Sequence, residues 1–180
     1  TIGNGVNRNT FGFGGTAKLT NKVTASGTIN YVSNDVKSPP TSTSFGSRAT
    51  STSVFGDLLY TPTAVDLSGL PWENPLDKSH VYYRGGNDIQ NQRWTLYNAF
   101  TVDKVNRSYG NFSLRYEVLK GLNLTYRIGF DNYVENQVYA QNKGGFHNPT
   151  GIYRTSTGNS NIWDHTFLLN YDRNLTNDLN

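Results

Sequence analysis

The fold of this chain is decided by residues 109–131, which read YGNFSLRYEVLKGLNLTYRIGFD. On both sides of Lys120 apolar residues alternate with polar ones, which is the pattern of a β-strand with one apolar face. Folding the stretch back at Lys120 pairs large residues with each other, as Phe112 with Ile128. Gly121 supplies a turn conformation that a side chain resists. The stretch is therefore predicted to be a β-hairpin whose register a slip of one residue would destroy.

The same pattern recurs near the start of the chain, on either side of a short connection at residues 20–22. Pairing across that connection sets small residues against small ones, as Ala17 against Ala25. It also sets large residues against large ones, as Phe13 against Ile29. A second hairpin is therefore predicted, with its apolar row again on one face.

Five strands of about ten residues are predicted in all, at residues 10–19, 23–32, 109–118, 122–131 and 162–171. Their connections alternate in length, with short turns at 20–22, 119–121 and about 173–179 and long segments at 33–106 and 134–160. In an antiparallel sheet, this alternation places every short turn at one end and every long loop at the other. Transmembrane β-barrels have short periplasmic turns, long external loops and strands of this length. The pattern predicts an all-β fold in which residues 1–180 form part of an antiparallel barrel wall.

The two faces of the predicted strands differ in chemistry. The apolar row is expected to face lipid and contains Phe13, Ala17, Ala25, Ile29, Phe112, Leu114, Ile128, Phe167 and Leu169. The polar row is expected to line the barrel interior, with its charges paired with each other or with a plug, and contains Lys18, Arg115, Glu117, Arg127 and Asp131. The rival fold is a soluble β-sandwich, which would bury the same apolar row against a second sheet.

The long segment 33–106 is expected to lie outside the membrane. A short helix is predicted within residues 54–60, whereas residues 37–53 are rich in Ser and Thr. Residues 93–102 alternate loosely, but a strand there would put the turn at 119–121 on the wrong side, so the external loop is preferred. Candidate contacts to a substrate or a lid protein are Trp72, Tyr82, Tyr83, Arg84, Asp88, Trp94 and Tyr97. The alternative for these side chains is that they pack one loop on another.

Composition excludes several classes of protein. The chain has no Cys, its 16 Lys and Arg residues are scattered, and its three His residues lie far apart. No cluster of basic residues suits a nucleic acid, and no spacing matches a zinc site, a serine-hydrolase elbow or a phosphate loop. The sequence predicts no enzyme, no cofactor and no metal site, although the carboxylate pairs Glu73/Asp77 and Asp131/Glu135 leave calcium open. A Thr at position 1 suggests an excerpt of a longer chain.

Two segments of the chain closely resemble a barrel hairpin of the SusC/RagA-type TonB-linked outer-membrane proteins of Bacteroidetes. They are residues 106–116, NRSYGNFSLRY, and residues 121–133, GLNLTYRIGFDNY. The stretches NRNTF at 7–11 and WTLYN at 94–98 are similar to the same family. The resemblance follows the chain in order over most of its length.

The resemblance implies a large plugged barrel in the outer membrane of a Gram-negative cell, in direct contact with the lipid bilayer. Such a barrel imports oligosaccharides or peptides beneath a SusD-like surface lipoprotein, with energy supplied by the TonB complex. Barrels of this kind have about 22 strands, so five strands are about a quarter of the wall. The plug and the TonB-contacting segment are expected outside these 180 residues. The alternative is an outer-membrane barrel that acts as an adhesin, an anchor or a component of a secretion machine.

Overall fold

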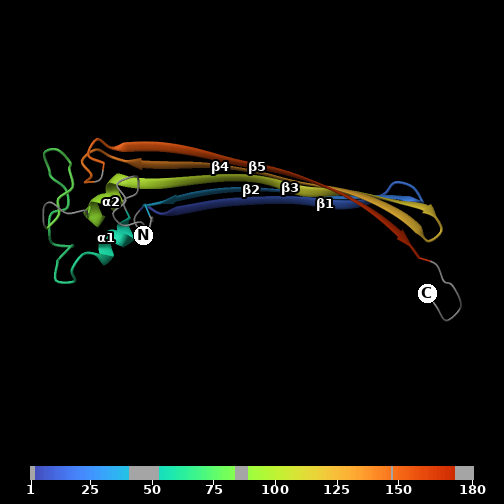
Figure 1. Ribbon diagram of the computed structural model, residues 1–180, viewed down its shortest axis with the longest axis horizontal. Coiled ribbons are helices and arrows are strands. Elements are labelled where there is room, and N and C mark those ends of the chain that lie inside the picture. Colours follow the sequence, from blue (N-terminus) through green and yellow to red (C-terminus); the bar gives the residue numbers. More distant parts are fainter. Residues whose placement is uncertain (1–2, 41–52, 84–88, 147, 173–180) are drawn as a thin grey trace. The chain divides into compact units, whose positions relative to one another are not determined.

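The computed structural model describes residues 3–40, 53–83, 89–146 and 148–172. Within them five antiparallel strands form one sheet in the order β1-β2-β3-β4-β5 (Figure 1). Their bounds are Gly5–Lys18 for β1, Val23–Ser38 for β2, Ala99–Leu119 for β3, Leu122–Gln141 for β4 and Ile152–Tyr171 for β5. The all-β prediction is confirmed as an open sheet, in which β1 and β5 are the edges of the described part.

Both predicted hairpins have the expected register, with Gly14 facing Thr28 in the first and Gly110 facing Phe130 in the second. At the first turn, the backbone N–H of Leu19 donates to the carbonyl of Val23 at 2.9 Å, and the Thr20 hydroxyl accepts from the N–H of Val23 at 3.0 Å. At the second turn, Gly121 has φ of 86°, the left-handed conformation that favours glycine. The turn expected near 173–179 lies outside the described residues.

The strands are longer than predicted, so the loops are shorter. The first long connection spans residues 39–98 rather than 33–106, and the second spans 142–151 rather than 134–160. The extra strand residues carry polar side chains on both faces, as the neighbours Glu135 and Asn136 do on β4. The alternation of apolar and polar residues stops there, but backbone pairing continues because ladder hydrogen bonds do not depend on the side chain.

Two short helices lie within the first long connection. Helix α1 (Val54–Leu59) confirms the predicted helix and is capped by Ser53, whose hydroxyl accepts from the N–H of Gly56 at 3.0 Å. Helix α2 (Gln92–Asn98) was not predicted, and the rest of segment 93–102 belongs to β3. The side chain of Asn91 caps α2 by accepting from the N–H of Arg93, which favours a helix over an extended chain. Among the described helices, none has the length and apolar character that crossing a membrane requires.

The chain divides into two compact units. The sheet unit contains Arg8–Ser33, Val105–Glu135 and Gly158–Asn180, and therefore both short turns. The loop unit contains Thr1–Asn7, Asn34–Lys104 and Asn136–Thr157, and therefore both long connections and both helices. The buried side chains of the described chain lie in the loop unit, where Trp94, Gln90 and Thr95 are fully enclosed.

Candidate functional site

An ion pair marks the polar face of the sheet unit. Arg107 on β3 reaches Asp131 on β4 with two donors, from Nε to Oδ1 at 2.9 Å and from Nη2 to Oδ2 at 2.5 Å. The guanidinium carbon also lies 4.9 Å from the ring centroid of Tyr109, close enough for a cation–π contact. Two parallel donors hold a carboxylate in a fixed orientation, so this pair is more ordered than a single contact would be.

The other residues predicted for the polar face make fewer side-chain hydrogen bonds than Arg107 and Asp131. The Nε of Arg115 donates to Oδ1 of Asn123 at 3.2 Å, and a second cross-strand bond joins Asn111 to Thr28 at 3.0 Å. The remaining predicted residues are Lys18, Glu117 and Arg127, of which only Glu117 is partly buried. The structure brings Asp131 together with Arg107, which was not among the predicted residues, and not with any of the others.

No described residue covers the apolar face of the sheet unit. Phe13 on β1 is 76% exposed, and Phe167 and Leu169 on β5 are 72% and 67% exposed. A second layer packed on this row would have indicated a sandwich, and none is present among the described residues. Aromatic rings associate on the same face, where Phe130 lies 5.8 Å from Trp163 between ring centroids.

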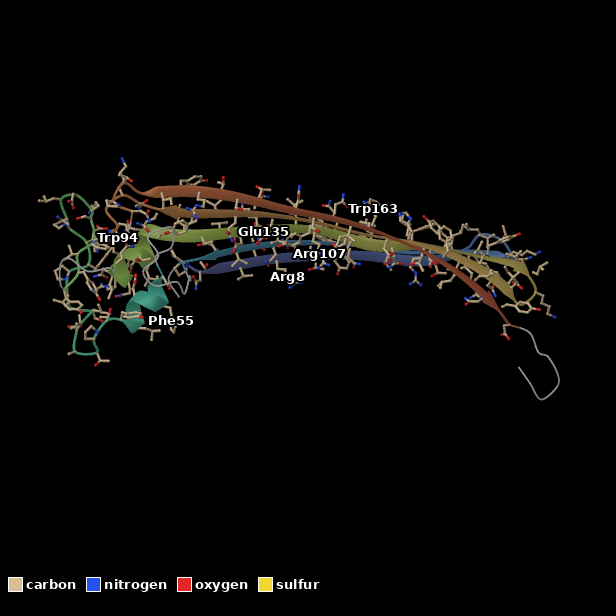
Figure 2. The ribbon with its side chains drawn as sticks, in the orientation of Figure 1. Arg8, Phe55, Trp94, Arg107, Glu135 and Trp163 are labelled. Carbon is tan, nitrogen blue, oxygen red and sulfur yellow. The ribbon has the colours of Figure 1, made fainter. Side chains whose placement is uncertain are left out.

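Trp94 is the centre of the loop unit and is 0% exposed (Figure 2). Its indole Nε1 donates to the carbonyl of Lys78 at 2.8 Å. The rings of Trp94 and His80 pack edge to face, with centroids 6.5 Å apart. A side chain with no exposed surface cannot touch a lid or a substrate in this structure. The predicted contact role of Trp94 is therefore corrected to a packing role, which is the stated alternative that these side chains pack one loop on another.

Gln90 joins the two long connections. Its amide Nε2 donates to the Thr95 hydroxyl at 2.8 Å, and its Oε1 accepts from the backbone N–H of Phe146 at 2.8 Å. The N–H of Asn142 also donates to the carbonyl of Asn98 at 2.8 Å. Because these bonds lie between segments far apart in sequence, the two loops fold as one unit.

Two aromatic rings and one guanidinium group stack in the loop unit: Trp72, Tyr97 and Arg93. The rings of Trp72 and Tyr97 stack with centroids 5.0 Å apart and planes at 24°, and the guanidinium of Arg93 lies 5.8 Å from the Trp72 ring. Arg93 is held by the carbonyls of Leu67 and Ser68, at 3.1 Å and 2.8 Å. Tyr97 is 56% exposed, so this stacked pair keeps a free ring surface.

The predicted residues on the other side of the loop are only partly described. The ring centroids of Tyr82 and Tyr83 lie 4.6 Å apart, and the Tyr82 hydroxyl forms a hydrogen bond of 2.7 Å with the hydroxyl of Thr61. Arg84 and Asp88 lie outside the described residues. The structure therefore separates Trp94, which is enclosed, from Trp72 and Tyr97, which reach the surface.

Asp57 on α1 is a buried carboxylic acid that the sequence did not single out. Burial raises its pKa from the ordinary 3.8 to about 7, although a backbone hydrogen bond from Gln90 partly opposes the change. Within the described residues its Oδ2 has no hydrogen-bond partner, and neither has the buried Oε1 of Gln92. A buried carboxylate with one of its oxygens unpaired is costly, so the neutral form is favoured.

Sequence reasoning missed Arg107 for an identifiable reason. The predicted strand began at residue 109, although the alternation that puts Asp131 on the polar face also puts Arg107 there. Extending the hairpin by two residues would have found the pair. In the described part of the chain, no group of three His, Asp or Glu side chains is placed to hold a metal ion.

Comparison with known proteins gives no match to a protein-family model and none to a curated protein sequence.

Proposed function

We propose that this chain forms part of the wall of an outer-membrane β-barrel transporter, of the SusC/RagA TonB-dependent type that its strands resemble. The observation that carries the proposal is a single sheet with one polar face and one uncovered apolar face. The apolar face includes Phe13 at one edge strand and Phe167 and Leu169 at the other, each about two-thirds exposed or more, and such a face would be costly in water. Lipid removes that cost, because acyl chains are as apolar as the row.

The height of the apolar row supports a membrane location. On β4 its apolar positions run from Leu122 to Phe130, eight residue steps or roughly 27 Å of strand. At a strand tilt of about 40° this covers roughly 20 Å along the membrane normal, close to the apolar band of about 25 Å in such barrels. The rings of Phe130 and Trp163, whose planes are tilted by 35°, lie at the end of the row nearer the long connections, where an aromatic girdle belongs.

The edges of the sheet support a larger wall. Along β1 and β5 the outer backbone N–H and C=O groups have no neighbouring strand in the described chain. Hydrocarbon tolerates no open edge, because each unpaired backbone group there costs several kcal/mol. In the proposed barrel further strands pair with both edges, and the polar face with Arg107 and Asp131 lines the interior.

The loop unit gives the external side of the proposal. A connection of 60 residues, 39–98, must offset its ordering cost by packing or binding. Its enclosed centre at Trp94 accounts for packing, and the exposed stack of Trp72 and Tyr97 offers a surface for a SusD-like lid or for a substrate. Oligosaccharides or peptides are the proposed cargo, and the TonB complex the proposed energy source.

Uptake by the full-length protein in its own outer membrane tests this function. Labelled oligosaccharides and peptides should enter cells that carry the protein and should fail to enter when TonB is absent. Deleting residues 39–90, between Ser38 and Asn91, should leave the barrel in the membrane and reduce uptake and lid binding. A barrel that assembles but gives no TonB-dependent uptake of any of these compounds would favour an anchor or an adhesin.

A further inference from the structure

A small pocket lies in the loop unit, beside the residues of the aromatic stack. Its volume is about 210 Å³, and it lies between Lys37 on β2, Tyr97 on α2 and Phe100 on β3. The other described residues that line it are Gly3, Pro39, Leu96 and Ala99. The ring of Tyr97 therefore stacks on Trp72 and also lines this pocket.

Lys37 is the charged group of the pocket. Its Nζ lies 5.0 Å from the ring centroid of Phe100, so the ammonium is held over an aromatic face. The ion pairs of the described residues are Lys78 with Glu73 and Arg107 with Asp131, and Lys37 belongs to neither. Lys37 is thus a cation over an apolar pocket with no carboxylate partner in the described part of the chain, and such a cation is complementary to an anion.

The size and the lining of the pocket restrict the ligand. Drug-sized ligands occupy about 300–1,000 Å³, so 210 Å³ suits a group of about one amino-acid side chain. Among the described residues that line the pocket, only Lys37 and Tyr97 have polar side chains. A sugar ring would leave most of its hydroxyls without partners here, which is unfavourable. An apolar body carrying one carboxylate leaves no such group unpaired.

We propose that this pocket binds a small apolar carboxylate, with the carboxylate paired to Nζ of Lys37 and the apolar body between the rings of Tyr97 and Phe100. The end of a peptide with an apolar last residue and a free branched-chain acid share this chemistry. The inference goes beyond the proposed transport function, because it requires neither the membrane nor TonB.

Binding to the full-length protein in detergent, measured by calorimetry, tests the pocket. The probes are 4-methylpentanoate and N-acetyl-leucine, each compared with its neutral amide. Both acids should bind about tenfold more tightly than their amides, because a charge-assisted hydrogen bond is lost in the amide. Binding of N-acetyl-leucine alone assigns the pocket to peptide ends, and equal binding of both acids assigns it to the apolar carboxylate itself.

Lys37→Met should remove the preference for the acid, and Lys37→Arg should retain it. The matched control is Lys104→Met, which removes a lysine of the same unit that does not line the pocket. Equal affinity for acid and amide in the wild-type protein would overturn the proposal, as would a Lys37→Met variant that still prefers the acid. If Lys37→Met fails to fold, the wild-type comparison decides alone. Membrane assembly and TonB-dependent uptake are measured separately, so failure of the pocket is distinct from failure of the transporter.

Discussion

Gly110 on β3 lies directly opposite the ring of Phe130 on β4, so close that a Cβ on Gly110 would be 3.1 Å from Cε1 of that ring. The same Cβ would clash with the backbone carbonyl of Thr28 on β2. The ring covers the gap that the missing side chain leaves, and the pairing is the one that the alternation about Lys120 predicts. Gly110 is therefore required by close approach of two strands and not by its backbone dihedral angles.

Gly110→Ala should destabilise the sheet by about 1–3 kcal/mol, as overpacking does, because the atom it meets on β2 is backbone and cannot rotate away. Gly15→Ala is the matched control, since a Cβ on Gly15 meets nothing within 4 Å. Urea unfolding in lipid vesicles measures both variants. Equal stability of the two would show that β2 and β3 are not paired in this register.

Trp94→Ala should unfold the loop unit while leaving the strands intact. Removing a fully buried Trp costs about 3–5 kcal/mol, which exceeds the stability expected of a small local unit. Trp72→Ala should cost only about 1 kcal/mol, because it removes a half-exposed stacking contact. Hydrogen exchange of residues 89–98, compared with 109–131, distinguishes the two effects. Unchanged protection of 89–98 in Trp94→Ala would contradict the assignment of Trp94 as the centre.

The buried Asp57 should make the loop unit less stable at high pH. Its folded pKa of about 7 lies above the ordinary value of 3.8, so its neutral form is favoured in the folded state. The stability of the loop unit should be highest below about pH 4 and fall by up to about 4 kcal/mol as the pH rises towards 7. Asp57→Asn should remove this dependence. Exchange protection of the loop unit at pH 5 and pH 8 measures it, and an identical pH profile in Asp57→Asn would refute the role of this carboxyl.

The ion pair of Arg107 and Asp131 should matter more for geometry than for stability. Both side chains are partly exposed, and exposed pairs contribute little free energy. Arg107→Ala, Asp131→Ala and the double variant should therefore unfold at nearly the same urea concentration as the wild type. Arg107→Lys should lose the two-point contact and loosen Asp131, which NMR of labelled protein can detect. A large loss of stability in either single variant would mean that a buried partner approaches the pair.

The sheet was predictable from the sequence because its register depends on a pattern of period two that survives over ten residues. Pairs of similar size, such as Phe112 with Ile128 and Ala17 with Ala25, indicate the register across each turn. The strand residues nearer the long connections were missed because polar residues there occupy both faces, as Glu135 and Asn136 do. Backbone pairing extended the strands where side chains carried no signal.

The loop unit was less predictable, because its order depends on bonds between distant segments. Gln90 accepts a hydrogen bond from the backbone N–H of Phe146, 56 positions further along the chain, and no local sequence pattern predicts such a contact. The exposure of the aromatic residues was equally hidden. Trp72 and Trp94 look alike in the sequence, yet only Trp94 is enclosed, because α2 turns it towards Lys78 and His80.

The central claim is that one face of the strands meets lipid and the other meets water, and single cysteines along β3 test it most directly. Residues 1–180 contain no cysteine, so a Cys placed at residues 111–116, one position at a time, has no competing thiol within this chain, and the same labelling of the protein without the added Cys is the background. In the full-length protein in vesicles, a water-soluble maleimide should label positions 111, 113 and 115. A lipid-borne quencher should dim fluorophores at 112, 114 and 116 instead. Labelling by the maleimide at all six positions, or at none, would contradict a barrel wall with a lipid face and a water-filled interior.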